Sequence, residues 1–140
     1  IKMARAFAKR LNASLAIIDK RRPRPNEMEV MNFIGDVAGK DVIIFDDMVD
    51  TAGTMTDAAR VCVEKQGARS VTASAPHPIL SGPALDRING SPLREVAVTN
   101  TIPFDRHDRC HKIKVLDVAP LLSEAIERIH LEKTVSALFV

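Results

Sequence analysis

Two adjacent carboxylates and a loop of small and hydroxyl-bearing residues form the stretch of this sequence best suited to chemistry. Asp46 and Asp47 follow the apolar run 42–45, and the loop 50–54 reads Asp-Thr-Ala-Gly-Thr. The apolar run is typical of a strand that is buried on both faces. The apolar residues of 55–62 recur at helical spacing, so we expect the loop to lead directly into a helix.

This order of elements suits a ligand with a phosphate at one end and hydroxyl groups at the other. The first backbone N–H groups of a helix lack partners and carry partial positive charge, so they receive an anion. Ala52 and Gly53 let an anion approach the backbone, while Thr51 and Thr54 add hydroxyl donors. Carboxylates beside an anion site need donors of their own, and the vicinal hydroxyls of ribose are such donors. We therefore expect ribose 5-phosphate to be bound by Asp46, Asp47, Asp50, Thr51, Ala52, Gly53 and Thr54.

The composition is that of a globular domain. The chain has 140 residues, of which 46% are hydrophobic and 27% charged, and this length suits a single domain over 1–140. The net charge of +2 gives no bulk field of the kind that nucleic-acid binders show, and the apolar runs are too short to cross a membrane. Cys62 and Cys110 form no metal-like pair, which favours reduced thiols in a cytoplasmic protein.

A second cluster of polar residues lies at 105–111, where two aspartates and two histidines surround Cys110. Its spacing matches no standard zinc site, so the sequence favours a polar surface loop there. The chain also lacks the Gly-x-x-x-x-Gly-Lys-Ser/Thr pattern of a Walker-type ATP loop. The sequence therefore indicates neither a standard zinc site nor a Walker-type ATP site.

Apolar periodicity predicts strands that alternate with helices. The expected strands are 14–18, 29–37, 41–46, 70–75, 95–100 and 114–118, and the expected helices are 2–12, 54–67, 81–88 and one beginning near 121. Such alternation predicts an α/β fold, an open and mainly parallel sheet with helices on both faces. Ligands of these sheets bind beyond the carboxyl ends of the strands, which is where Asp46, Asp47 and the basic loop after residue 18 should lie.

Several of these motifs resemble one known family. Residues 46–54 look like the phosphoribosyl signature of the type I phosphoribosyltransferase fold. Residues 19–26 (Asp-Lys-Arg-Arg-Pro-Arg-Pro-Asn) and 72–84, with their Pro-His-Pro core, are similar to ribose-phosphate pyrophosphokinase, also called phosphoribosyl pyrophosphate synthetase. The likeness continues to 134–139 but covers only the C-terminal half of that family's usual chain. It implies the C-terminal, phosphoribosyltransferase-like domain of a two-domain synthetase.

The resemblance implies transfer of the diphosphoryl group of ATP to the 1-hydroxyl of ribose 5-phosphate, which yields 5-phosphoribosyl 1-diphosphate and AMP. Lys20 and Arg22 are then the catalytic cations, because negative charge spreads over the phosphoryl oxygens during transfer. Mg²⁺ accompanies the ATP, with its direct ligands expected outside these residues. Asp50 is the nearest candidate proton acceptor, with helix capping and ribose binding as the alternatives. His77 is expected to be a supporting residue.

The same resemblance extends to assembly and regulation. The family forms hexamers, so a homo-oligomer is expected. Its C-terminal segment contributes to an allosteric site for phosphate or ADP, and the matching residues here are Thr134, Ser136 and Phe139. Threonine replaces the usual serine at the first of these positions, and Ala137 replaces an aromatic residue, which leaves the detail of regulation open.

Three alternative functions remain open at this point. A type I phosphoribosyltransferase would share the 46–54 motif, but the basic loop and the 76–84 segment argue against it. A non-catalytic regulatory subunit of the synthetase is disfavoured by the intact Lys20, Arg22 and sugar-phosphate loop. A nucleic-acid-binding module is disfavoured by the near-neutral net charge. We expect the 140 residues alone to be inactive or nearly so.

Overall fold

A four-stranded parallel sheet forms the centre of the fold, which the computed structural model describes for residues 2–21, 30–105 and 109–139. Its strands, in the order in which they lie side by side, are β3 (Asp41–Phe45), β5 (Ser70–Ser74), β7 (Leu93–Thr99) and β8 (Ile113–Leu116). All three neighbouring pairs are parallel. The prediction of an open, mainly parallel α/β sheet is therefore confirmed.

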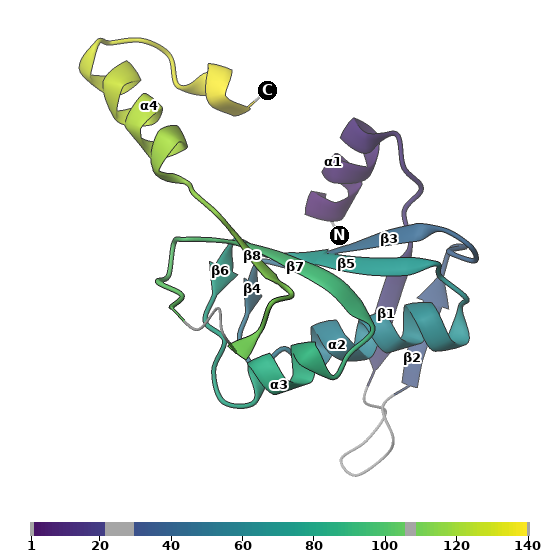
Figure 1. Cartoon of the computed structure of the whole chain (residues 1–140). Helices are drawn as coiled ribbons and strands as arrows, with labels where there is room; N and C mark the ends of the chain where they lie inside the picture. Colours follow the sequence, from purple (N-terminus) through teal and green to yellow (C-terminus); the bar gives the residue numbers. More distant parts are fainter. Residues whose placement is uncertain (1, 22–29, 106–108, 140) are drawn as a thin grey trace.

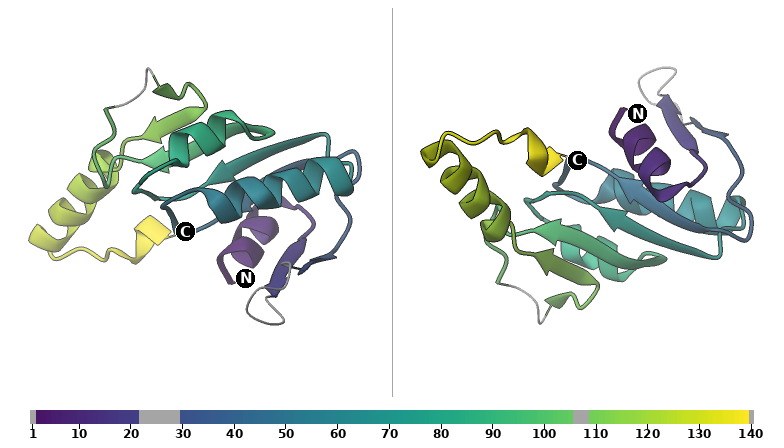
Figure 2. Two further views of the ribbon diagram at one scale, coloured as in Figure 1. Left: turned by 90° about the horizontal axis from the view of Figure 1, so that it is seen from below. Right: turned by 90° about the horizontal axis from the view of Figure 1, so that it is seen from above.

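Helices lie on both faces of this sheet. The helices of the described residues are α1 (Lys2–Leu11), α2 (Gly53–Arg60), its π-helical continuation η1 (Val61–Lys65), α3 (Ala84–Asn89), α4 (Ala119–His130) and the 3-10 helix η3 (Ser136–Phe139). α2 and α3 cover one face, while α1 lies over β3 on the other (Figure 1). Figure 2 shows the same layers from below and from above. The chain leaves η1 through Gly67, whose φ of 68° is the left-handed conformation expected at a helix end.

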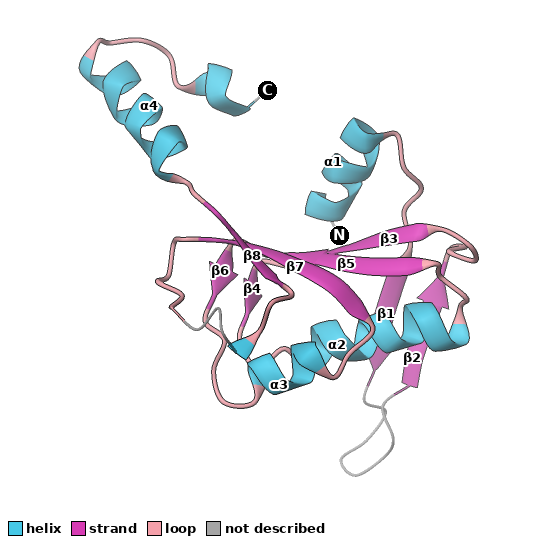
Figure 3. Cartoon of the chain, viewed as in Figure 1, coloured by secondary structure: helices cyan, strands magenta, loops and turns pink. Residues whose placement is uncertain are grey.

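Two smaller sheets flank the main one (Figure 3). β1 (Ile17–Arg21) pairs antiparallel with β2 (Val30–Ile34), and β4 (Met48–Val49) pairs in parallel with β6 (His77–Pro78). The strand predicted at 14–18 is thus displaced toward the basic segment, because its pairing with β2 continues as far as Arg21. The strand predicted at 29–37 is confirmed in a shorter form as β2. The two-residue strands β4 and β6 were not predicted.

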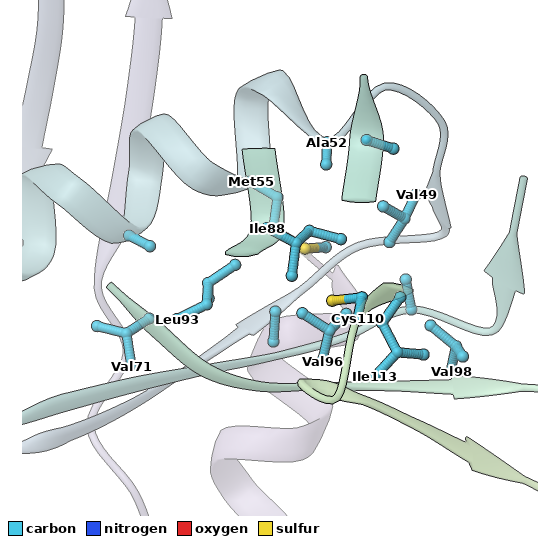
Figure 4. Packing of buried hydrophobic residues seen from close by; sticks show 14 of the residues in the cluster. Val49, Ala52, Met55, Val71, Ile88, Leu93, Val96, Val98, Cys110 and Ile113 are labelled. Carbon is cyan, nitrogen blue, oxygen red and sulfur yellow. The ribbon is translucent and has the colours of Figure 1, made fainter. Parts of the chain in front are cut away.

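The hydrophobic core fills the space between the sheet and the helices α2 and α3. Val71 and Val96 point from the sheet into this layer and are fully buried. Met55 of α2 and Ile88 of α3 meet them from the helical side (Figure 4). Cys110 also belongs to this core and is 1% exposed, so the interpretation of 105–111 as a surface loop is wrong for this residue.

β3 departs most from its prediction. In the described part of the chain it pairs only with β5, so it is an edge strand rather than a central one. Ile43 keeps 47% of its side chain exposed, which contradicts the expectation of burial on both faces. Phe7 of α1 stacks on Phe45 with ring centroids 4.2 Å apart and covers the end of the strand.

α4 extends away from the sheet (Figure 1). It carries an apolar face that the described residues leave uncovered. Leu122, Ile126 and Ile129 are 56%, 68% and 69% exposed. The helix start is fixed to the sheet, because Asp117 accepts hydrogen bonds from the Ala119 amide at 2.9 Å and from the side-chain amide of Asn100 at 2.7 Å. No helix among residues 2–21, 30–105 and 109–139 is both long and apolar enough to cross a membrane.

The contrast between α3 and α4 predicts two different costs for the same substitution. Ile88→Ala should lower the free energy of unfolding by about 2–5 kcal/mol, because it opens a cavity in the core. Ile129→Ala is the matched control on the exposed face of α4 and should change it by less than about 0.5 kcal/mol. Urea unfolding of both variants measures the difference. Equal losses would contradict this assignment of the core.

Candidate functional site

The paired carboxylates lie where the sequence predicted, just beyond the carboxyl end of β3. The Asp46 amide still donates to the Ser74 carbonyl at 3.0 Å, so this residue continues the line of the sheet. Asp46 is half-buried and Asp47 is exposed. The Asp47 amide donates to Asp46 Oδ1 at 2.9 Å, which fixes the Asp46 carboxylate relative to the backbone. One carboxylate is therefore held in place and its neighbour faces solvent.

The environment of Asp46 disfavours its charged form. Burial raises the pKa of Asp46, and the adjacent Asp47 carboxyl raises it further. The hydrogen bond from the Asp47 amide opposes these effects but does not cancel them. A ligand that donates hydrogen bonds to this carboxylate would stabilise its charged form, as the hydroxyls of a sugar do.

The loop between β4 and α2 opens the start of the helix toward a ligand. Ala52 precedes α2 with φ 59° and ψ 7°, a left-handed conformation that is rare for a residue with a Cβ. Among the described residues, no side chain caps this helix start. Thr56 instead donates from Oγ1 to the carbonyls of Ala52 and Gly53, at 2.9 and 3.0 Å. The first amides of α2 therefore keep their capacity to bind an anion.

Asp50 is bound to the 76–84 segment. Its carboxylate accepts a hydrogen bond from Ser81 Oγ, and its carbonyl accepts one from the Ser81 amide at 3.1 Å. These bonds join the loop to the chain that follows β6. They favour a structural role for the Asp50 carboxylate over that of a free proton acceptor. Sequence reasoning did not place Ser81 in the site, although the residue lies inside a motif that it had selected.

Arg87 is a second residue of the site that the sequence did not indicate. It is exposed on α3, and its Nη1 donates to the Thr51 carbonyl at 3.0 Å. The two residues are 36 positions apart in the chain. An arginine on a short helix has no local signature that points to such a contact.

The proposed catalytic cations are only partly described. Lys20 lies on β1, opposite Met31 of β2, and Arg22 lies outside the described residues. The start of β1 and the candidate site border one cavity of about 410 Å³, whose lining includes Ile17, Asp46 and Thr54. The β1–β2 hairpin and the carboxylate of Asp46 thus line the same cavity.

Within the described residues, the C-terminal segment 134–139 makes hydrogen bonds with α4 and α1 rather than with the loop 50–54. Arg128 Nη1 donates to the Thr134 carbonyl at 3.2 Å, and Thr134 Oγ1 accepts from the Ser136 amide at 3.2 Å. Arg10 of α1 donates to the Phe139 carbonyl at 3.1 Å, while the Phe139 side chain is 75% exposed. Residues Ser136–Phe139 of the segment form a 3-10 helix.

The sequence also singled out His77 and the polar cluster at 105–111. His77 is exposed, and its Nδ1 lies 2.9 Å from Thr101 Oγ1 at the carboxyl end of the sheet; its supporting role stays a prediction. Within the described residues, no group of three or more His, Cys, Asp or Glu could hold a metal ion, and the prediction for the 105–111 cluster stays a prediction. His107 and Asp108 lie outside that part.

Comparisons with known proteins give matches over nearly the whole chain. The chain is 53% identical over 139 residues to a ribose-phosphate pyrophosphokinase of Clostridium acetobutylicum and 53% identical over 136 residues to that of Bacillus subtilis. These alignments cover 99% and 97% of this chain and 43% of each relative. A crystal structure of phosphoribosylpyrophosphate synthetase from Mycobacterium smegmatis aligns with a TM-score of 0.84 at 36% identity, over 94% of this chain and 42% of that one. The chain thus spans less than half the length of these relatives.

The fold and the position of the site define an α/β domain of the kind found in phosphoribosylpyrophosphate synthetases. The family described as "Phosphoribosyl synthetase-associated domain" matches residues 20–140, which is most of the chain. The chain belongs to this family.

The raised pKa of Asp46 predicts that removing its charge stabilises the fold. Because the folded-state pKa lies above the ordinary value of 3.8, ionisation of Asp46 at higher pH opposes folding. Asp46→Asn should therefore raise the urea midpoint at pH 7, and the gain should shrink as the pH falls through the carboxyl range. Urea unfolding between pH 3 and pH 7 measures both effects.

Asp41 provides a matched control of opposite sign. Hydrogen bonds from Arg69 and from Ser70 Oγ, the latter at 2.6 Å, lower the pKa of Asp41. Asp41→Asn should therefore lower the midpoint at pH 7, with the loss fading as the pH falls below the ordinary carboxyl pKa. A shift of both variants in the same direction would contradict this electrostatic account.

Proposed function

We propose that this chain forms the ribose 5-phosphate site of a ribose-phosphate pyrophosphokinase. The observation that carries the proposal is the order of two features at the carboxyl edge of one parallel sheet. A carboxylate pair, in which Asp46 is held by the Asp47 amide, is followed by a helix start without a side-chain cap. The family match and the names of the relatives support it. In the proposed reaction, the 1-hydroxyl of ribose 5-phosphate attacks the β-phosphorus of ATP, and AMP leaves.

The two ends of the substrate have different partners in this proposal. The amides and hydroxyls of 51–54 receive the 5-phosphate, through charge-assisted hydrogen bonds worth roughly 1.5–3 kcal/mol each. Asp46 and Asp47 accept hydrogen bonds from the ribose hydroxyls, which also offsets the cost of ionising Asp46. Asp50 shapes the loop between them through Ser81.

Lys20 and Arg22 are proposed to stabilise the negative charge that develops on the transferred group. Both lie in or next to the β1–β2 hairpin in the sequence, and the start of β1 borders the same cavity as Asp46 and Thr54. By analogy with arginine fingers, loss of either cation should lower the rate by on the order of 10³-fold.

A magnesium ion bound with ATP would neutralise phosphate charge in this reaction. Magnesium is commonly held by one or two carboxylates together with substrate phosphates, and the pair Asp46 and Asp47 fits that requirement. In this proposal the nucleotide phosphates chiefly hold the metal. The carboxylates would then reach it through the ribose hydroxyls or water.

Further proposals follow from the family resemblance. These residues correspond to the C-terminal domain of a longer two-domain synthetase, which assembles as a homo-oligomer, a hexamer in the family. Thr134, Ser136 and Phe139 belong to a site for phosphate or ADP as effectors. The two buried free thiols, Cys62 and Cys110, support a reducing, cytoplasmic location. No nucleic-acid or membrane partner is proposed.

Calorimetric titration of the chain with ribose 5-phosphate tests the proposed site. The unmodified chain should bind it saturably, and the double variant Asp46→Asn, Asp47→Asn should bind it at least about tenfold more weakly, because two acceptors of ribose hydroxyls lose their charge. Inorganic phosphate should bind the double variant as well as it binds the unmodified chain, since the phosphate end is intact.

Asp36→Asn is the control, because its exposed carboxylate pairs with Lys40 away from the site. This variant should bind ribose 5-phosphate normally. Failure of the unmodified chain to bind the sugar phosphate would overturn the proposal. An assay of AMP release should show little or no turnover by the 140 residues alone.

A further inference from the structure

Arg87 touches two residues of the proposed phosphate loop. Its Nη1 donates to the Thr51 carbonyl at 3.0 Å. A Cβ placed on Gly53 would lie 3.4 Å from the same Nη1 and 4.0 Å from the Arg87 Cζ. The guanidinium therefore occupies the space beside Gly53 that a larger side chain would need.

The charge of Arg87 is directed at this loop rather than at an acidic partner. Among residues 2–21, 30–105 and 109–139, the ion pairs are Lys40–Asp36, Arg60–Asp57, Arg69–Asp41 and Arg128–Glu124, and none of them includes Arg87. A guanidinium has five N–H donors, so the bond to one carbonyl leaves others for a ligand or water. The bond to Thr51 is charge-assisted and is stronger than a bond between neutral groups.

The position of Arg87 is fixed by the helix that carries it. Leu85 and Ile88 of α3 are 2% and 0% exposed and anchor the helix in the core. Lys112 Nζ donates to the carbonyls of Ile88, Asn89 and Ser91 at 3.1, 3.0 and 2.8 Å and closes the end of the helix. α3 therefore presents Arg87 to the loop from a rigid support.

We propose that Arg87 is a positioning residue for the sugar phosphate, an inference that rests on the proposed function. The peptide group between Thr51 and Ala52 is planar, so its C=O and N–H point in opposite directions. By holding the Thr51 carbonyl, Arg87 turns the Ala52 N–H to the opposite side. The same bond supports the left-handed conformation of Ala52, which has φ 59°.

Titration of the 140-residue chain with ribose 5-phosphate compares three variants with the unmodified protein. Arg87→Met keeps an unbranched, apolar side-chain stem but removes the donors, and it should weaken binding about tenfold. Arg87→Lys keeps a charged donor and should bind within about threefold of the unmodified chain. Arg94→Met removes an exposed arginine at the start of β7, near Asp41, and should not change the affinity.

The Ala52 amide resonance gives a readout that general destabilisation would not move. This N–H shares a peptide group with the Thr51 carbonyl, so its ¹⁵N shift should change in Arg87→Met without ligand, and return toward the original value in Arg87→Lys. Thermal unfolding shows whether each variant is folded. If Arg87→Met does not fold, Arg87→Gln replaces it, since its shorter side chain also loses the reach to Thr51.

The outcomes separate the two proposals. No binding by the unmodified chain overturns the proposed function and this inference with it. Binding by the unmodified chain and by folded Arg87→Met with equal affinity overturns only the role of Arg87. Equal weakening in Arg87→Met and Arg94→Met also overturns that role, because loss of net charge would then explain the effect.

Discussion

The turn that leads into α2 is the constraint on which the candidate site depends. Ala52 adopts a left-handed conformation that costs an L-residue about 1–2 kcal/mol, and the turn persists because its surroundings hold it. Ala52 and Thr56 are buried, and the Thr56 hydroxyl binds the carbonyl of Ala52. Since this hydroxyl and Arg87 satisfy carbonyls on one side of the turn, the amides on its other side stay available. The core thereby supports a backbone arrangement that α2 would not adopt alone.

The parallel sheet and the location of the site could be predicted from local sequence. Strands such as 70–74 and 93–99 carry the apolar residues that a sheet needs, and the 50–54 loop carries the small residues that an anion site needs. The carboxyl ends of parallel strands meet at one edge, so this position follows from topology alone. In both cases the residues that determine the structure lie next to one another in the sequence, so the pattern could be recognised without the fold.

Contacts between distant segments could not be predicted in the same way. The bonds of Asp50 with Ser81 and of Thr51 with Arg87 join residues 31 and 36 positions apart. They arise only when α3 packs beside the start of α2, and no spacing rule records that. The pair β4 and β6 was missed because two-residue strands are too short to show alternation.

The prediction for β3 was wrong for a related reason. A run of valine and isoleucine has the same appearance whether a strand has one neighbour or two. The composition of Val42–Ile44 therefore predicted the strand correctly but not its place at the end of the strand order. The apolar face of α4 is a comparable case, because amphipathic spacing predicts a helix without showing what covers it.

The edge position of β3 has a consequence for the behaviour of the chain in solution. Within the described residues its outward N–H and C=O groups face no other strand, and an extended segment that reaches them can add to the sheet. Residues of α1 and α2 line the adjoining cavity, so an added segment would also gain apolar contacts. At high concentration, copies of the chain are thus prone to join edge to edge.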